Sequence, residues 1–357
     1  MSTSLFDPIS FSNLTLRNRL WVSPMCQYSA IDGVPNAWHQ AHYGAFAQGR
    51  AALIMVEATG VVPEARITPG CLGLWNDEQA QAFKPIVEFA HLNGSAIGVQ
   101  LAHAGRKASA GIPWSAHRVL DQSQGGWQTV APSPLAYPGM NQPHELTVQE
   151  ITQLTDDFVA ATLRAQEIGF DVIEIHAAHG YLFHQFLSPL SNTRTDDYGQ
   201  SFENRTRFLI DTVAAVSAAL QGKTTLFVRI SASDWTEGGW SIDESIQLSQ
   251  KLKTLGVELI DVSSGGNVHG AAITAGPGFQ VPFATAIKAA GVPTSAVGLI
   301  DSAEQAQAII QNGEADAVMI GRSFLRNPHW TLEVAEELGL SIEWPQQYDR
   351  ARRNPKG

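Results

Sequence analysis

Short apolar segments recur along the chain, and polar stretches with helical character separate them. The apolar segments are rich in β-branched residues and are nearly continuous rather than alternating. Continuous hydrophobicity is typical of a strand whose two faces are both buried, as in a parallel sheet covered by helices. The pattern therefore predicts eight buried strands, in Leu20 to Pro24, Ala52 to Ala58, Ala96 to Leu101, Val172 to Ile175, Leu226 to Ile230, Leu259 to Val262, Ser295 to Leu299 and Ala317 to Ile320.

Capping boxes predict where three of the intervening helices begin. They occupy Thr147 to Glu150, Ser241 to Glu244 and Ser302 to Gln305. In a capping box, a hydroxyl and a carboxylate or amide three residues later satisfy free backbone N–H groups at the helix start. Repeated strand-helix alternation predicts an α/β fold, and we expect a (β/α)8 TIM barrel. A doubly wound open sheet would produce the same alternation over most of its length.

The length of 357 residues fits one barrel of roughly 250 residues that carries insertions, so we predict a single domain over residues 1–357. Residues 106–146 interrupt the alternation after the third strand and are rich in Gly, Pro, Ser, Gln and Trp. A long loop at that position lies on the C-terminal face, where barrel active sites are built. We expect residues 106–146 to form a cap, and residues 341–357 to form an irregular tail.

Composition narrows the class of protein. Hydrophobic residues make up 44% of the chain and charged residues 16%, which suits a large buried core. The net charge of -11 opposes binding to nucleic acid. Two cysteines outside any CxxC pair, a start without signal-peptide features and the lack of an 18-residue apolar run lead us to expect a cytoplasmic protein with no membrane contact.

Three polar side chains directly follow the predicted strand Val172 to Ile175. His176 and His179 could hold a carbonyl oxygen as it gains charge, and Tyr181 could donate a proton, as an enolate-forming reduction requires. A zinc site is a rival interpretation, but the histidines have i,i+3 spacing and no clear third ligand. A third interpretation is a pair of core histidines satisfied by hydrogen bonds.

Glycines close the last two predicted strands. Gly298 ends the seventh, and Gly321, followed by Arg322, ends the eighth. In many barrels these two loops hold a phosphate through backbone N–H groups, which glycine allows to approach closely. Either glycine alone would be explained by an ordinary helix turn. Their occurrence at matched strand ends predicts a ligand that carries a phosphate.

Arg229 lies inside the fifth predicted strand, where a buried guanidinium needs an anionic partner. A structural carboxylate would serve. The alternative is the pyrimidine edge of a reduced flavin, which carries negative charge. Gln100, near the end of the third strand, could hydrogen-bond the same edge.

Together these residues resemble the old yellow enzyme family, in particular its bacterial subclass of short, cysteine-bearing ene-reductases. The resemblance covers nearly the whole chain. It rests on Leu16 to Arg19, Ser23 to Tyr28, Gln100 to Lys107, His176 to Leu182, Phe186 to Arg194, Asp197 to Gly199 and Glu203 to Arg205.

The resemblance implies a tightly bound, non-covalent FMN and NADPH as the hydride donor. By that resemblance, Pro24, Met25, Cys26, Ala58, Gln100 and Arg229 hold the flavin, with Cys26 tuning its potential, and Gly298, Gly321 and Arg322 hold its phosphate. His176 and His179 bind the substrate oxygen, Tyr181 supplies the proton, Tyr28 lines the substrate pocket and Lys107 lies near the flavin. Gln347 to Arg350 resembles a segment that lends an arginine to a neighbouring subunit, which makes Arg350 a candidate in a homodimer or homotetramer.

The resemblance thus predicts an FMN-dependent NADPH dehydrogenase that reduces the activated C=C bond of enones and enals by ping-pong hydride transfer. Two alternatives remain at this level. One is a sugar-phosphate aldolase or isomerase on the same barrel, with Lys107 as a Schiff-base amine. The other is a non-catalytic flavin-binding scaffold. Flavin barrels with an iron-sulfur cluster need more than the two cysteines of this chain.

Overall fold

The computed structural model describes residues 3–352 and confirms a closed parallel barrel. Its strands neighbour one another in the order β10, β11, β12, β3, β4, β5, β8 and β9, and β9 pairs with β10 to complete the ring. This closure rules out the open sheet. Each predicted run overlaps one strand of the barrel: β3 Leu20–Val22, β4 Leu53–Gly60, β5 Ala96–Ala102, β8 Val172–Ala177, β9 Thr225–Ser231, β10 Leu259–Ser263, β11 Thr294–Ala296 and β12 Ala317–Ile320.

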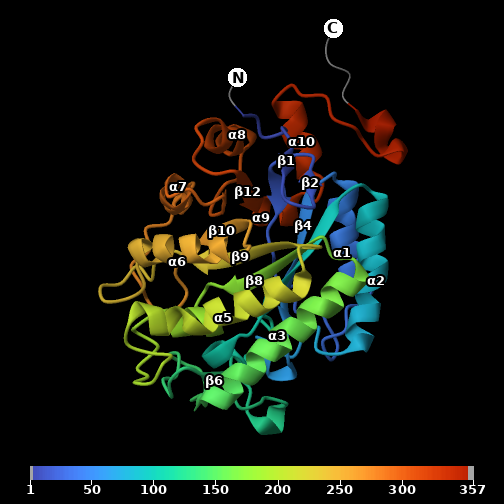
Figure 1. Ribbon diagram of the computed structural model, residues 1–357. Helices are drawn as coiled ribbons and strands as arrows, with labels where there is room; N and C mark the ends of the chain where they lie inside the picture. Colours follow the sequence, from blue (N-terminus) through green and yellow to red (C-terminus); the bar gives the residue numbers. More distant parts are fainter. Residues whose placement is uncertain (1–2, 353–357) are drawn as a thin grey trace.

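Helices surround the barrel (Figure 1). Two further short elements, β1 and β2, form a hairpin before the barrel begins. The helices are α1 Ala37–Gln48, α2 Asp77–Leu92, α3 Val148–Ile168, α4 Leu182–Leu187, α5 Phe202–Leu220, α6 Ile242–Thr254, α7 Val281–Ala289, α8 Ala303–Gln311, α9 Arg322–Arg326 and α10 Trp330–Glu337, and the hairpin strands are β1 Ile9–Ser10 and β2 Thr15–Leu16.

The capping boxes at Thr147 and Ser241 form as predicted and begin α3 and α6. The third is half correct. Ser302 accepts from the Gln305 N–H and begins α8, but the Gln305 amide accepts from the N–H of Asp301 instead of Ser302. The reciprocal bond is therefore displaced by one residue.

The seventh strand is shorter than the predicted run to Leu299. It ends at Ala296. Gly298 has a φ of 120° and Leu299 a φ of 53°, so the backbone leaves the extended region before the apolar run ends. Hydrophobicity continues there because Ile300 is buried in the core beyond the strand.

Inward-facing side chains divide the barrel interior into an apolar lower layer and a polar upper layer. Successive residues of a strand face opposite sides, so positions two apart share a face. In the lower layer, the Trp21 and Phe227 rings stack with centroids 6.1 Å apart, and Phe11 follows the first hairpin strand to meet Phe227 at 5.0 Å. Two residues further along β9, the inward position is occupied by Arg229. The upper layer is therefore polar and lies at the carboxyl ends of the strands.

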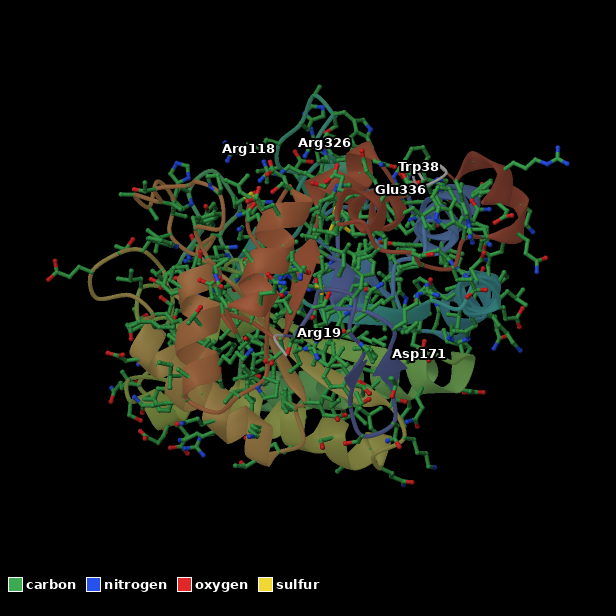
Figure 2. All side chains as sticks on the ribbon, turned by 90° about the horizontal axis from the view of Figure 1, so that it is seen from above. Arg19, Trp38, Arg118, Asp171, Arg326 and Glu336 are labelled. Atoms are coloured by element: carbon green, nitrogen blue, oxygen red, sulfur yellow. The ribbon has the colours of Figure 1, made fainter. Side chains whose placement is uncertain are left out.

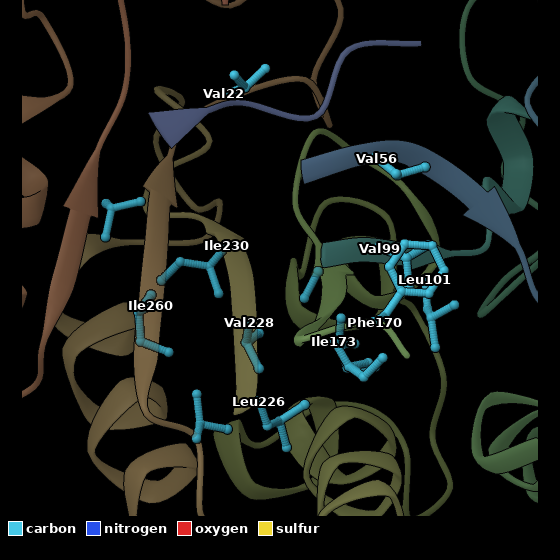
Figure 3. Packing of buried hydrophobic residues seen from close by; sticks show 14 of the residues in the cluster. Val22, Val56, Val99, Leu101, Phe170, Ile173, Leu226, Val228, Ile230 and Ile260 are labelled. Atoms are coloured by element: carbon cyan, nitrogen blue, oxygen red, sulfur yellow. The ribbon is translucent and has the colours of Figure 1, made fainter. Parts of the chain in front are cut away.

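Outward-facing residues of the same strands form the main core with the helices. Val99, Val228 and Ile260 pack in this layer, which Figure 3 shows between the strands and their covering helices. All three are fully buried. Burying one such side chain contributes about 1.5–3 kcal/mol. The helices thus hold the barrel closed while its upper interior stays polar.

Residues 106–146 follow β5 and contain η2 Gly105–Lys107, η3 Gln122–Gln124, β6 Val130–Ala131 and β7 His144–Glu145. The segment contacts three loops that follow barrel strands. The N–H of Ala110 donates to the carbonyl of Ile67 after β4, and the Ser133 hydroxyl accepts from the N–H of Thr193 after β8. Arg106 donates to the Asn267 carbonyl after β10. These contacts lie on the C-terminal side of the barrel.

The chain ends beyond α10 in η4 Gln346–Ala351, where the Tyr348 ring lies 5.4 Å from the ring of His329. Residues 353–357 of the predicted tail lie outside the described residues. No helix within residues 3–352 is long and apolar enough to cross a membrane.

Candidate active site

The end of β8 and the turn after it bring His176, His179 and Tyr181 together. His176 occupies an inward position of the strand, and the other two residues precede α4. The His176 ring centroid lies 5.1 Å from that of His179 and 5.1 Å from that of Tyr181, and both contacts are edge-on. The structure therefore makes one cluster of the three predicted residues. No group of three or more His, Cys, Asp or Glu side chains in the described residues is arranged to hold a metal.

The His176 imidazole is held in one tautomer by the backbone. Its Nδ1 accepts from the N–H of Ala178 at 3.3 Å, so a neutral ring carries its proton on Nε2. Burial lowers the pKa of His176 well below its usual value, and the charge of Arg229 lowers it further. His176 is therefore neutral at pH 7 and has an N–H to donate.

His179 is fixed through its backbone and its ring. Its N–H donates to the Ser231 hydroxyl at 2.8 Å, and its Nε2 lies 2.8 Å from the hydroxyl of Ser263. Burial lowers the pKa of His179 well below its usual value, followed by the charge of Arg229. The Ser263 hydroxyl also lies 3.3 Å from the amide oxygen of Gln280, but its contact with His179 is shorter; when Ser263 donates to His179, the neutral ring carries its proton on Nδ1.

Tyr181 and Lys107 lie side by side. The Lys107 ammonium is 5.1 Å from the centroid of the Tyr181 ring, and it donates to the carbonyls of His179 at 2.8 Å and Gly266 at 3.0 Å. Burial lowers the pKa of Lys107 to about 8, and the charge of Arg106 adds to the effect. Burial also raises the pKa of Tyr181 well above its usual value, so its phenol keeps its proton at neutral pH. Lys107 thereby links the loop after β8 to the loop after β10.

Gly180 permits this close approach of two loops. Its φ is 71°, and a Cβ at this position would lie 2.3 Å from the carbonyl oxygen of Gly266. A side chain would push the two loops apart. The close approach of the two loops therefore requires glycine between His179 and Tyr181.

A buried pair that sequence reasoning missed supports the turn from below. The Nδ1 of His184 accepts from the Gly180 N–H at 2.9 Å, and its Nε2 lies 2.9 Å from a carboxylate oxygen of Asp234. Both side chains are fully buried. Asp234 also accepts from the Ser188 hydroxyl at 2.5 Å and from the Trp240 N–H at 2.9 Å. The available signal was a histidine and an aspartate in apolar surroundings, with nothing in the sequence to pair them.

Arg229 has a structural carboxylate as one partner. Its Nε lies 3.0 Å from Asp261, which stands opposite it on β10. Neither terminal nitrogen of the guanidinium has a hydrogen-bond partner within residues 3–352. Gln100 donates to Glu174 at 2.8 Å, and burial raises the pKa of Glu174 to about 8. The Nε of Arg229 thus pairs with Asp261 of the barrel, and the two terminal nitrogens of the guanidinium are free to bind an anion.

The remaining predicted flavin contacts lie at strand ends in the same barrel. Ala58 stands opposite Gln100 in the β4–β5 ladder. Pro24 and Met25 follow β3, and a Cβ on Gly321 would lie 3.4 Å from the Met25 sulfur. Gly298 follows β11, whereas Gly321 precedes Arg322, the first residue of α9. These positions come from five strands that are consecutive around the barrel, β11, β12, β3, β4 and β5.

The two cysteines are neighbours. Cys26 donates a hydrogen bond to Cys71, and this contact, with burial second, raises the pKa of Cys26 well above its usual value. The same bond lowers the pKa of Cys71 to about 7. Tyr28, two residues after Cys26, has a φ of 51°, and burial raises the pKa of its phenol. No sequence feature pointed to Cys71.

A cavity of about 360 Å³ connects Tyr28 and Tyr181 with residues of the 106–146 segment. Lys107 and Tyr137 also line it. Arg350, by contrast, is exposed on η4, which lies at the edge of the molecule (Figure 1). The predicted substrate tyrosine and the predicted proton donor therefore share one hollow, and Arg350 is not part of its lining.

Comparisons with known proteins identify the family of the chain. Residues 4–341 match the NADH:flavin oxidoreductase / NADH oxidase family. The chain is 46% identical over 357 residues to the NADPH dehydrogenase of Geobacillus thermodenitrificans, covering 99% of this chain and 100% of that protein. It is 47% identical over 355 residues to the NADPH dehydrogenase of Bacillus pumilus, and the match covers 98% of this chain and 100% of that protein. Morphinone reductase has a similar structure, with a TM-score of 0.80, 29% identity and coverage of 97% and 92%. The old yellow enzyme homologue from Zymomonas mobilis also has a similar structure, with a TM-score of 0.78 and 30% sequence identity. The match covers 97% of this chain and 98% of that chain.

Proposed function

The chain belongs to the NADH:flavin oxidoreductase / NADH oxidase family, and we propose on that basis that it reduces the activated C=C bond of α,β-unsaturated carbonyl compounds. It is an FMN-dependent oxidoreductase of the old yellow enzyme and NADPH dehydrogenase type. The aldolase or isomerase and the non-catalytic scaffold considered from the sequence are not favoured, because the similar proteins are oxidoreductases.

The residues present fit FMN. The free terminal nitrogens of Arg229 suit the anionic edge of a reduced flavin, and Gly298, with a φ of 120°, leaves a loop without a side chain after β11. Pro24, Met25, Cys26, Ala58 and Gln100 would hold the ring system, and Gly298, Gly321 and Arg322 its phosphate. When bound, FMN supplies the redox chemistry, taking hydride from NADPH and returning it to the acceptor.

The observation that carries the proposal is the cluster in which the ring of His176 lies 5.1 Å from the rings of both His179 and Tyr181. The Nε2–H of His176 and the Nδ1–H of His179 would donate to the acceptor carbonyl oxygen and stabilise the negative charge that develops there. Tyr181 would give its proton to the α-carbon. Tyr28 lines the same cavity and would pack on the bound molecule.

Donor and acceptor would use this hollow in turn, which gives ping-pong kinetics. Residues 106–146 would act as a cap over it, because they contact the loops after β4, β8 and β10. Arg350 is exposed and makes no contact with the cavity of its own chain, so we assign it to the active site of a neighbouring subunit in a homodimer or homotetramer. We further propose a cytoplasmic location.

The test is the visible spectrum of the purified protein before and after anaerobic NADPH, followed by cyclohexenone. We expect a flavin spectrum that bleaches with NADPH and returns with the enone. His176→Ala and His179→Ala should each slow the return by about 10², while the flavin content of each variant, read from its absorbance, serves as the control for folding and FMN binding. Wild-type rates of return in both variants would reject the imidazole assignment. A colourless protein that takes up no FMN would reject the function.

A further inference from the structure

The cavity beside Tyr181 has a charge opposite to that of the chain. Its lining contains Lys107, His117 and Arg118 but no Asp or Glu. The whole chain has 34 acidic residues against 23 Lys and Arg. A lining that is basic in an acidic protein points to an anionic ligand.

Arg118 has unused hydrogen-bonding capacity. Its side chain is exposed at the rim of the molecule (Figure 2), and within residues 3–352 its guanidinium has no hydrogen-bond or ion-pair partner. Its backbone carbonyl accepts from the N–H of Gly111, which fixes the loop that carries it. A guanidinium offers five donors in a planar fork that matches a carboxylate or a phosphate.

Lys107 joins this cation to the reacting end of the cavity. Its ammonium lies between two rings, 4.9 Å from the centroid of Tyr137 and 5.1 Å from that of Tyr181. Two of its three donors are used by backbone carbonyls. The same cavity is therefore lined by the rings of Tyr137 and Tyr181 and by two cationic side chains, Lys107 and Arg118.

The carboxylate of Asp121, three residues after Arg118 in the chain, does not neutralise Arg118. Its oxygen accepts from the Ser123 hydroxyl at 2.6 Å and from the Gln124 N–H at 3.1 Å, at the start of η3. Asp121 itself is not part of the lining.

We propose that this cavity binds an anionic group, a carboxylate or a phosphate, at the far end of the molecule whose reacting end lies at His176 and Tyr181. The inference rests on the proposed function, because it takes that reacting end to be an enone carbonyl or a nicotinamide ring. Two sources carry this chemistry. One is an acceptor with a carboxylate, and the other is the phosphates of the nicotinamide dinucleotide.

Binding to the oxidised holoenzyme tests the acceptor source. The probes are benzaldehyde and two derivatives with a para-carboxylate, attached directly or through two carbons, measured by isothermal titration calorimetry. We expect at least one acid to bind about fivefold more tightly than benzaldehyde. Arg118→Gln should remove that gain and Arg118→Lys should keep part of it. Lys223→Gln is the matched control, because Lys223 is an exposed cation between α5 and β9, at the opposite end of the barrel.

The anaerobic reduction of the flavin by NADPH tests the dinucleotide source. If the dinucleotide supplies the anion, Arg118→Gln should raise the apparent Kd for NADPH about fivefold, and the acids should show no gain. If a carboxylate of the acceptor supplies the anion, Arg118→Gln should leave NADPH binding unchanged, and the acids should no longer bind this variant more tightly than benzaldehyde does. No effect of Arg118→Gln in either experiment overturns the proposal. Wild-type protein that NADPH does not reduce, or that an enone does not reoxidise, rejects the proposed function instead.

Discussion

Replacing His184 with leucine removes the partner of a buried carboxylate beneath the active-site turn. In the wild type, burial would raise the pKa of Asp234, but hydrogen bonds from His184, Ser188 and Trp240 outweigh burial and hold that pKa below its usual value. His184→Leu leaves the Asp234 charge with two hydrogen bonds instead of three. It also leaves the N–H of Gly180 without its acceptor.

The expected cost follows from these two losses. Removing one partner of a buried pair costs about 3–5 kcal/mol, because the remaining charge is uncompensated. Asp234 keeps Ser188 and Trp240, and a buried N–H without an acceptor costs about 1–3 kcal/mol. Since the two losses share one side chain and are not additive, we expect His184→Leu to lower the free energy of unfolding by about 4 kcal/mol at pH 7.5.

Urea unfolding followed by far-UV circular dichroism, at one fixed concentration of FMN, measures this cost. In the variant the pKa of Asp234 rises above its unfolded value, so stability is lost as pH increases above that value. The cost should therefore be smaller at pH 5 than at pH 7.5. His184→Leu combined with Asp234→Asn should be more stable than His184→Leu alone. A cost below about 1 kcal/mol, or equal costs at both pH values and in the double variant, would refute the buried-charge explanation.

Three further predictions concern other parts of the site. Gly298→Ala would place a Cβ 2.7 Å from the Gln280 amide at a φ of 120°, so we expect a loss of about 1–3 kcal/mol in urea unfolding and less FMN retained on gel filtration. Burial lowers the pKa of His103 to about 3, whereas in the unfolded chain this histidine binds a proton near pH 6.5. His103 should therefore lower the free energy of unfolding of the wild type by about 2 kcal/mol between pH 8 and pH 5, and the free energy of unfolding of His103→Gln should fall less over the same range. Ser263→Ala should slow flavin reoxidation by an enone about fivefold, because His179 loses its hydroxyl partner, and should lower the free energy of unfolding by about 1 kcal/mol.

The barrel could be predicted from the sequence because burial of both strand faces leaves a visible pattern. All eight apolar runs contain strands. The end of β11 could not be predicted, since the apolar run continues through Gly298 and Leu299, whose backbone turns away. The hydrophobic residues after Ala296 thus indicate that this part of the chain is buried, but not that its backbone is extended.

The candidate site could be predicted where one strand end supplies several residues, as with His176, His179 and Tyr181. Partners from different strands could not. The need of Arg229 for an anion was clear, but its pairing with Asp261 depends on the β9–β10 register, which the closed barrel sets. The contact of Cys26 with Cys71 likewise depends on how two loops fold together.

The ammonium of Lys107 donates to carbonyls in the loops after β8 and β10, so the positions of these two loops are coupled. Substitutions in the β10 loop made to widen acceptor scope should therefore disturb the carbonyl of His179, even when they lie far from any ligand. Libraries aimed at new acceptors should therefore leave Lys107 and Gly266 unchanged and vary exposed positions such as Arg118, whose side chain makes no contact with either loop within residues 3–352.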